Sequence, residues 1–168
     1  MASVHRVENT DVARNLEQIT EALALLDDIV FPCHPRTEAR LKQQGLWNEH
    51  RDKVTIIKPI GYLDMLVLES RAHQILTNSG GIQKDAYMLK VPCITMRMQT
   101  EWVETVEDGW NILTGAKKEK ILQAAMEFKG QTIQRNVFGK GASQRIVGIN
   151  ETKNTLFRFF DFYQYTLC

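Results

Sequence analysis

The sequence lacks the features that define several classes of protein. Its three cysteines lie far apart and form no Cys-x-x-Cys pair, which argues against a disulfide framework and against a zinc site. No apolar run is long enough to span a bilayer, and the N-terminus lacks the apolar segment of a signal peptide. A net charge of +1 gives no electrostatic basis for binding nucleic acid or an anionic membrane. These absences predict a cytoplasmic protein that binds neither nucleic acid nor a membrane.

What remains is the composition of one globular domain, in which short apolar segments alternate with amphipathic ones. The chain has 168 residues, of which 43% are hydrophobic and 24% are charged. Apolar runs predict strands at residues 28–33, 54–57, 74–78, 92–96 and 111–113. Helical spacing predicts helices at residues 11–26, 35–46, 62–72, 82–89 and 117–128. This order predicts an α/β fold, a Rossmann-like open parallel sheet with helices on both faces.

The turn Ser79-Gly80-Gly81 joins a predicted strand directly to a predicted helix. The two glycines leave the backbone N–H groups at the helix start unobstructed, and the helix dipole favours an anion there. The Ser79 hydroxyl can cap the helix or donate to a phosphate oxygen. Asp85 follows one helical turn later, where a carboxylate can accept both hydroxyls of a ribose. The pattern indicates a nucleotide diphosphate site, although Ser-Gly-Gly alone is more often an ordinary turn.

Two other polar loops follow predicted strands. One begins at His5-Arg6 and the other is His34-Pro35-Arg36. Because ligands of open parallel sheets bind outside the carboxyl ends of the strands, we expect both loops to gather near the Ser79 turn. The strand that leads into His5 is expected to be short, since only four residues precede it.

The last residues of the chain continue none of these patterns. The stretch 156–167 holds six aromatic side chains in about a dozen positions and follows a polar segment. One interpretation is a final strand or helix docked on the core. The other, which we favour, is non-native sequence produced by a truncation or frameshift. We therefore place a domain boundary at residue 149 and treat 150–168 as an atypical tail.

Six segments, in order and with nearly the right spacing, resemble the non-hydrolysing UDP-N-acetylglucosamine 2-epimerase family. The resemblance covers the C-terminal half of that family and residues 4–149 of this chain. The matched segments are His-Arg-Val-Glu-Asn (5–9), His-Pro-Arg (34–36), Pro-Ile-Gly-Tyr-Leu-Asp (59–64), Ser-Gly-Gly-Ile-Gln-Lys-Asp-Ala (79–86), residues 91–104 ending in Thr-Glu-Trp-Val-Glu, and Phe-Gly-Lys-Gly-Ala-Ser (138–143). Ordered matches at six places are far more specific than any one of them.

The resemblance implies a two-domain GT-B fold that holds UDP in the cleft between its domains. The family inverts C2 of the sugar by eliminating UDP to a glucal-type intermediate and adding it back, without a metal or nicotinamide cofactor. Complete members are expected to be homodimers that supply precursors for cell-wall or surface polysaccharides. The first half of the fold carries the carboxylates that move the C2 proton, and no acidic pair in this chain matches that role. We therefore expect this chain to be inactive alone.

The resemblance also implies roles for individual residues. His5 would contact the diphosphate and assist departure of UDP. Ser79 and Gly80 would hold the β-phosphate, Gly81 would belong to the same UDP-binding turn, and Asp85 would bind the ribose. Arg6 and His34 match a second, regulatory UDP-sugar site of bacterial members.

The sequence departs from the family pattern at several positions, and other functions stay open. Asp85 replaces a glutamate, Asn78 replaces an aspartate, and Lys140 replaces an acidic residue. The same motifs also suit epimerases of UDP-diacetamido-uronic acid sugars. A GT-B glycosyltransferase is a second class of function. A third is a non-catalytic nucleotide-sugar-binding module that pairs with a separately encoded N-terminal half.

Overall fold

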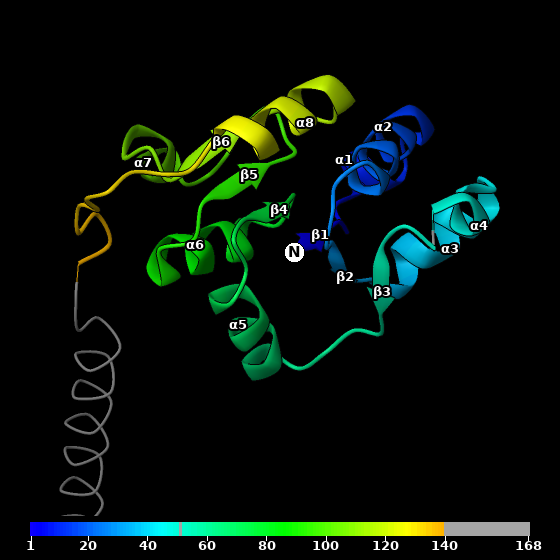
Figure 1. The fold of residues 1–168 in the computed structure, drawn as a ribbon, viewed down its shortest axis with the longest axis horizontal. Helices are drawn as coiled ribbons and strands as arrows, with labels where there is room; N and C mark the ends of the chain where they lie inside the picture. The colour runs from blue at the N-terminus through cyan, green and yellow to red at the C-terminus, as the bar shows by residue number, and fades with distance from the viewer. Residues whose placement is uncertain (51, 140–168) are drawn as a thin grey trace, which may run out of the picture. The chain divides into compact units, whose positions relative to one another are not determined.

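The computed structural model describes residues 1–50 and 52–139, and residues 1–135 form one compact unit (Figure 1). The strands are β1 (Ala2–Ser3), β2 (Val30–Pro32), β3 (Thr55–Ile57), β4 (Ile75–Thr77), β5 (Cys93–Thr95) and β6 (Asn111–Leu113). The helices are α1 (Val7–Thr10), α2 (Ala13–Ala24), α3 (Pro35–Gln43), α4 (Leu46–His50), α5 (Tyr62–Ser70), α6 (Gly80–Leu89), α7 (Val103–Glu107) and α8 (Lys118–Glu127). None of the helices in the described part of the chain has the length and apolar character needed to cross a membrane.

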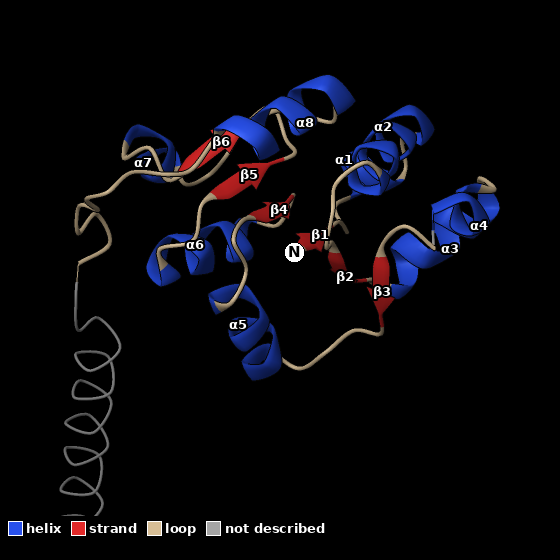
Figure 2. Cartoon of the chain, viewed as in Figure 1, coloured by secondary structure: helices blue, strands red, loops and turns tan. Residues whose placement is uncertain are grey.

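The strands are parallel and reverse their order at β1. One ladder runs β1-β4-β5-β6 and a second joins β2 to β3, while β1 and β2 lie side by side (Figure 2). The order across the molecule is therefore β3-β2-β1-β4-β5-β6, that of a doubly wound sheet. The chain runs from β1 to β2 and β3 on one side and then returns to β4 on the other side of β1, so a crevice is expected between the carboxyl ends of β1 and β4.

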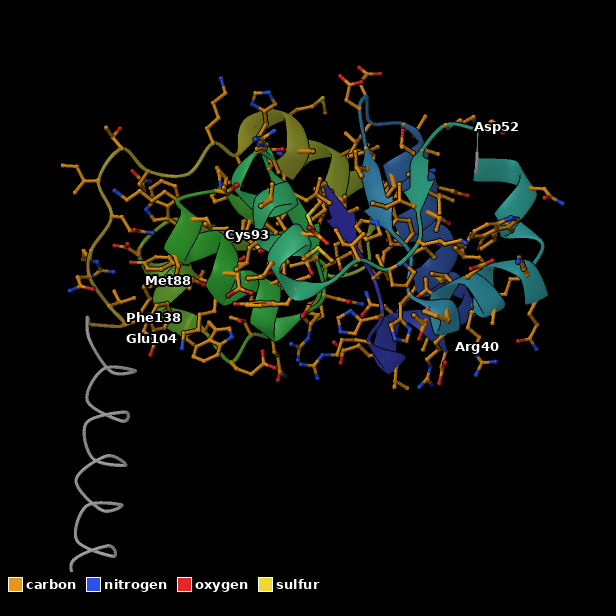
Figure 3. All side chains as sticks on the ribbon, turned by 90° about the horizontal axis from the view of Figure 1, so that it is seen from below. Arg40, Asp52, Met88, Cys93, Glu104 and Phe138 are labelled. Carbon is orange, nitrogen blue, oxygen red and sulfur yellow. The ribbon has the colours of Figure 1, made fainter. Side chains whose placement is uncertain are left out.

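Two apolar cores cover the two faces of the sheet. Leu16, Ile19 and Leu23 of α2 are buried on one face, together with Ile121 of α8. On the other face, α5 and α6 pack over a smaller core that includes Cys93. Figure 1 shows these helix pairs on opposite sides of the strands, and Figure 3 shows Cys93 in the interior while Arg40 lies at the outer edge. Helices on both faces of a parallel sheet confirm the predicted fold class.

The predicted elements are found within a few residues of their expected bounds, and three short helices are additional. The helices α1, α4 and α7 have four or five residues each, too few to show a helical period in the sequence. The predicted helix 35–46 ends earlier, at Gln43, and Gly45 adopts a φ of +77°. Residues 140–168 lie outside the described residues, so the boundary at 149 and the aromatic tail stay predictions.

Candidate functional site

The carboxyl ends of β1, β2 and β4 bring three of the predicted loops together. The ring centroids of His5 and His34 lie 6.2 Å apart, although 28 positions separate the residues in the sequence. Asn78 accepts hydrogen bonds on Oδ1 from the backbone N–H groups of His5, at 3.1 Å, and Arg6, at 3.4 Å. The side chain that directly precedes Ser79 thus holds the loop that carries His5. The expected gathering of these loops at one edge of the sheet is what the structure shows.

Helix α6 begins at the Ser79 turn, as the glycine pair predicts. Ser79 is the N-cap residue with extended backbone angles, but its hydroxyl makes no capping hydrogen bond. The Ser79 backbone N–H instead donates to the Thr77 hydroxyl at 3.0 Å. Of the two predicted roles of the Ser79 hydroxyl, capping is therefore not used, which leaves the hydroxyl for a ligand. The first backbone N–H groups of a ten-residue helix and this hydroxyl form the start of the candidate site.

The two glycines of the turn are in different surroundings. Gly80 is buried, and a Cβ atom there would lie 3.2 Å from Oε1 of Glu101. Gly81 is exposed, and a Cβ atom there would meet only Ser79 Oγ, at an ordinary contact distance of 3.8 Å. A side chain at position 80 would therefore displace the Glu101 carboxylate by a few tenths of an ångström. At position 81 the missing side chain keeps the outer surface of the turn open.

An alternating row of charges lies beside the turn. Glu101 accepts from Arg97 at 2.9 Å and lies 3.4 Å from the Arg6 guanidinium, and Arg97 also pairs with Glu8 at 2.6 Å. The backbone N–H of Glu101 and the Arg97 guanidinium hold the pKa of this carboxyl below its usual range. Each arginine of the row is therefore paired with a carboxylate, and the row links the loops that follow β1 and β5.

Burial lowers the pKa of His5, and the nearby His34 and Arg6 lower it further. The imidazole is therefore neutral at pH 7 in this structure. A neutral imidazole can accept a proton, and a bound anion next to it would raise its pKa again. His34 is exposed, and its Nδ1 accepts from the Arg36 backbone N–H at 3.2 Å, so it caps α3. Arg6 and His34 thus flank His5, but their predicted regulatory role stays a prediction.

Asp85 lies on α6, half-buried, and has a buried carboxylate neighbour that the sequence did not reveal. Its carboxylate makes no hydrogen bond within the described residues, and burial raises its pKa. The neighbour is Glu69 of α5, which is completely buried and has no hydrogen-bond partner on either oxygen among the residues described. Burial, and to a lesser degree Asp85, raises the pKa of Glu69 to about 7. The sequence shows Glu69 only as one of two carboxylates of α5, with Asp64, and does not distinguish the buried one from the exposed one.

A buried polar network supports the turn from behind. Gln83 of α6 accepts on Oε1 from the Thr100 hydroxyl at 2.5 Å and from Asn111 Nδ2 at 3.2 Å. Asn111 in turn accepts from the Thr95 hydroxyl at 2.7 Å and donates to Thr105 at 3.0 Å. The motif resemblance included Gln83, but it gave no role for its side chain. In the structure that side chain joins α6 to β6 and to the loop that follows β5.

Over the same described ranges, no group of three or more His, Cys, Asp or Glu side chains is placed to hold a metal ion. The chemistry on offer is instead that of an anion site. It combines the N-terminus of α6, a free serine hydroxyl, a neutral imidazole and two nearby arginines, at the point where the strand order reverses.

A family model described as UDP-N-acetylglucosamine 2-epimerase matches residues 1–151. The chain belongs to this family. It is 50% identical over 147 residues to a UDP-N-acetylglucosamine 2-epimerase homolog of Methanococcus maripaludis, covering 85% of this chain and 41% of the relative. It is 44% identical over 153 residues to the UDP-2,3-diacetamido-2,3-dideoxy-D-glucuronate 2-epimerase of Pseudomonas aeruginosa, covering 87% of this chain and 42% of the relative.

Solved structures of UDP-N-acetylglucosamine 2-epimerases have the same fold. The Methanocaldococcus jannaschii enzyme in complex with UDP-GlcNAc and UDP matches with a TM-score of 0.81 and 43% identity, over 90% of this chain and 44% of that one. A Staphylococcus aureus relative in complex with UDP matches with a TM-score of 0.73 and 28% identity, over 92% of this chain and 44% of that one. The chain thus spans less than half the length of the epimerases it matches. The predicted membership of this family and the Rossmann-like half of a GT-B fold are confirmed.

Proposed function

We propose that this chain is the UDP-binding half of a UDP-N-acetylglucosamine 2-epimerase. The observation that carries the proposal is the start of α6 at the reversal point of the sheet, with an uncapped helix N-terminus, an unused Ser79 hydroxyl and a Gly81 open to solvent. Backbone N–H groups at such a helix start bind phosphate oxygens. The 43% identity to an epimerase structure that contains UDP-GlcNAc and UDP supports UDP as the diphosphate.

In the proposed reaction, the sugar loses its C2 proton and UDP leaves C1, and UDP then returns as C2 is protonated on the opposite face. Ser79, Gly80 and Gly81 hold the β-phosphate and Asp85 holds the ribose. The diphosphate raises the pKa of His5, whose protonated imidazole then stabilises the charge on the departing UDP. Asp85 is one methylene shorter than the family's glutamate, so its bond to the ribose requires a closer approach of the nucleoside to α6.

The proton transfers at C2 need carboxylates within hydrogen-bond reach of that carbon. We assign these to an N-terminal domain, so the chain alone is expected to bind UDP without epimerising UDP-GlcNAc. The complete enzyme is proposed to be a cytoplasmic homodimer that supplies polysaccharide precursors. UDP-2,3-diacetamido-2,3-dideoxy-D-glucuronate is the second candidate substrate, because the Pseudomonas aeruginosa epimerase of that sugar is 44% identical.

Calorimetric titration of UDP into the purified chain tests the proposal. Saturable binding is expected, and Ser79→Ala and His5→Ala are each expected to weaken it by about tenfold, the effect of one charge-assisted hydrogen bond. The matched controls are Ser70→Ala and His73→Ala. They change exposed residues at and just after the C-terminal end of α5. A folded chain that binds no UDP at millimolar concentration contradicts the proposal, and so does a loss of affinity that is equal in the controls.

A further inference from the structure

The loop that follows β5 fixes the carbonyl group inside the Ser79 turn. The indole N–H of Trp102 donates to the Gly80 carbonyl oxygen at 2.7 Å. From this contact we propose that Trp102 is the positioning residue of the turn. It sets the direction of the backbone N–H groups that receive the diphosphate. The proposal deepens the proposed function and rests on it.

The bond to the Gly80 carbonyl acts on the donor next to it. The carbonyl of Gly80 and the N–H of Gly81 belong to one rigid peptide plane. The Gly81 N–H is among the first four of α6, which have no acceptor within the helix and are directed at the candidate ligand. A hydrogen bond that fixes the carbonyl therefore also fixes the donor. Two consecutive glycines have the widest choice of backbone angles of any residue pair, so a side-chain donor to this carbonyl adds a restraint at the start of the helix.

Trp102 is itself held on both sides, which allows it to act as a fixed support. Its backbone N–H donates to the Thr100 hydroxyl at 3.0 Å. Its carbonyl oxygen accepts from the Thr105 backbone N–H at 3.0 Å and from the Thr105 hydroxyl at 2.7 Å, at the start of α7. The Thr100 hydroxyl also donates to Gln83 of α6. Trp102 is thus attached through its indole to the helix that it positions and through its backbone to Thr100 and to α7.

A cation completes the contact on the outer side. The Lys84 ammonium lies 4.8 Å from the centroid of a Trp102 ring, within the range of a cation–π interaction. Lys84 is four residues after Gly80, so the backbone carbonyl and the ammonium that contact the indole lie on one side of α6. The indole therefore touches the helix at two points one turn apart. This arrangement resists a rotation of the first turn about the helix axis.

The chain offers a matched control for the loss of an indole N–H. Trp110 is buried, with 7% of its surface exposed, and its Nε1 has no hydrogen-bond partner among the described residues. Trp110→Phe therefore removes an indole N–H without removing an acceptor contact. Trp102→Phe removes the N–H that donates to the Gly80 carbonyl oxygen and keeps an aromatic ring in place. A difference between the two variants reports the hydrogen bond rather than the change of residue type.

The deciding measurement compares a ligand that carries the diphosphate with one that does not. We expect Trp102→Phe to weaken the binding of UDP by about tenfold in calorimetry, which is the effect of one hydrogen bond. The affinity for uridine, measured by NMR titration, is expected to stay unchanged. Trp110→Phe is expected to keep the ratio of UDP to uridine affinity at its wild-type value. Equal weakening of both ligands by Trp102→Phe, or no weakening of either, overturns the proposal.

A second measurement needs no ligand and separates this proposal from the proposed function. The Gln83 backbone N–H closes the first turn of α6 on the Ser79 carbonyl at 3.2 Å. Its amide exchange with deuterium is expected to accelerate in Trp102→Phe and in Thr100→Val, and to stay unchanged in Trp110→Phe. If the wild-type chain binds no UDP, the proposed function fails, and acceleration of this exchange still supports Trp102 as the support of the turn. Unchanged exchange in a folded Trp102→Phe chain contradicts it.

Discussion

Asn78 illustrates, at the scale of single residues, how a departure from the family pattern is accommodated. Its Oδ1 accepts the backbone N–H groups of His5 and Arg6, a role that the family's aspartate could also fill. Its Nδ2 is buried and has no partner within the part of the chain that the structure describes. An unsatisfied buried donor costs about 1–3 kcal/mol. The asparagine thus keeps the His5 loop in place at some cost to stability.

The lowered pKa of His5 predicts a loss of stability in acid. The pKa of His5 is lower in the folded state than in the unfolded chain. As the pH falls below about 6.5, the unfolded chain is therefore protonated at His5 before the folded state is. The contribution of His5 to the free energy of unfolding is therefore expected to decrease from pH 7 towards pH 5. His5→Gln should remove this part of the pH dependence, measured as the melting temperature at both pH values. An unchanged slope in the variant would contradict the assignment.

Sequence reasoning found the residues whose signal is local and missed those whose signal depends on a distant partner. Ser79, Gly80 and His5 follow strands directly, so their place at the sheet edge could be predicted from neighbouring residues. Trp102 acquires its role from a carbonyl 22 positions earlier in the chain, which no periodicity encodes. Glu69 likewise looked like one more helix residue. Its significance comes from burial, which the sequence alone does not specify.

At the scale of elements, α5 carries a buried carboxylate against the smaller core. With its pKa raised to about 7, Glu69 is deprotonated in the unfolded chain above about pH 4.5 but stays protonated in the folded chain up to neutrality. The contribution of Glu69 to stability is therefore expected to fall as the pH rises from 4.5 to 7. Glu69→Gln should be more stable than wild type at pH 8, by an amount on the order of 1–3 kcal/mol, and should lose this slope.

Denaturant melts of the Glu69→Gln chain at pH 5 and pH 8 measure the effect. Glu104→Gln, a change of an exposed carboxylate on α7, is the matched control and should keep the wild-type slope. A Glu69→Gln variant that is less stable than wild type at pH 8 would show that the carboxylate has a partner that stabilises its charge.

The residue that caps the C-terminal end of α6 has a backbone conformation that lysine does not favour. Lys90, the C-cap, has φ 59° and ψ 40°, in the left-handed region where a side chain costs about 1 kcal/mol relative to glycine. Lys90→Gly is therefore expected to raise the free energy of unfolding by about 0.5–1 kcal/mol. Lys117→Gly is the control, because the N-cap Lys117 has φ −89°, and it should give no gain. Denaturant melts distinguish the two, and an equal effect in both would contradict the conformational explanation.

At the scale of the whole molecule, the surface of the chain includes a group of exposed apolar side chains. Apolar side chains of α5 are exposed, among them Leu63 at 74% and Tyr62 at 65%. Such surfaces promote association, and single domains are only marginally stable. We expect marginal stability and concentration-dependent association, measured by sedimentation velocity and thermal unfolding at several concentrations. A sharp, reversible transition of a monomer that does not change with concentration would contradict this.

The polar network behind the Ser79 turn constrains how this part of the sequence can change. Asn111 accepts from Thr95 and donates to Gln83 inside the core, so a substitution of Asn111 removes a hydrogen-bond partner from both of the other two side chains. Their mutational effects should therefore be strongly non-additive. A library that randomises the three positions together should return all-polar or all-apolar combinations and few mixtures. The three codons would then evolve as one unit, and a lineage could leave the present set only by several changes made together.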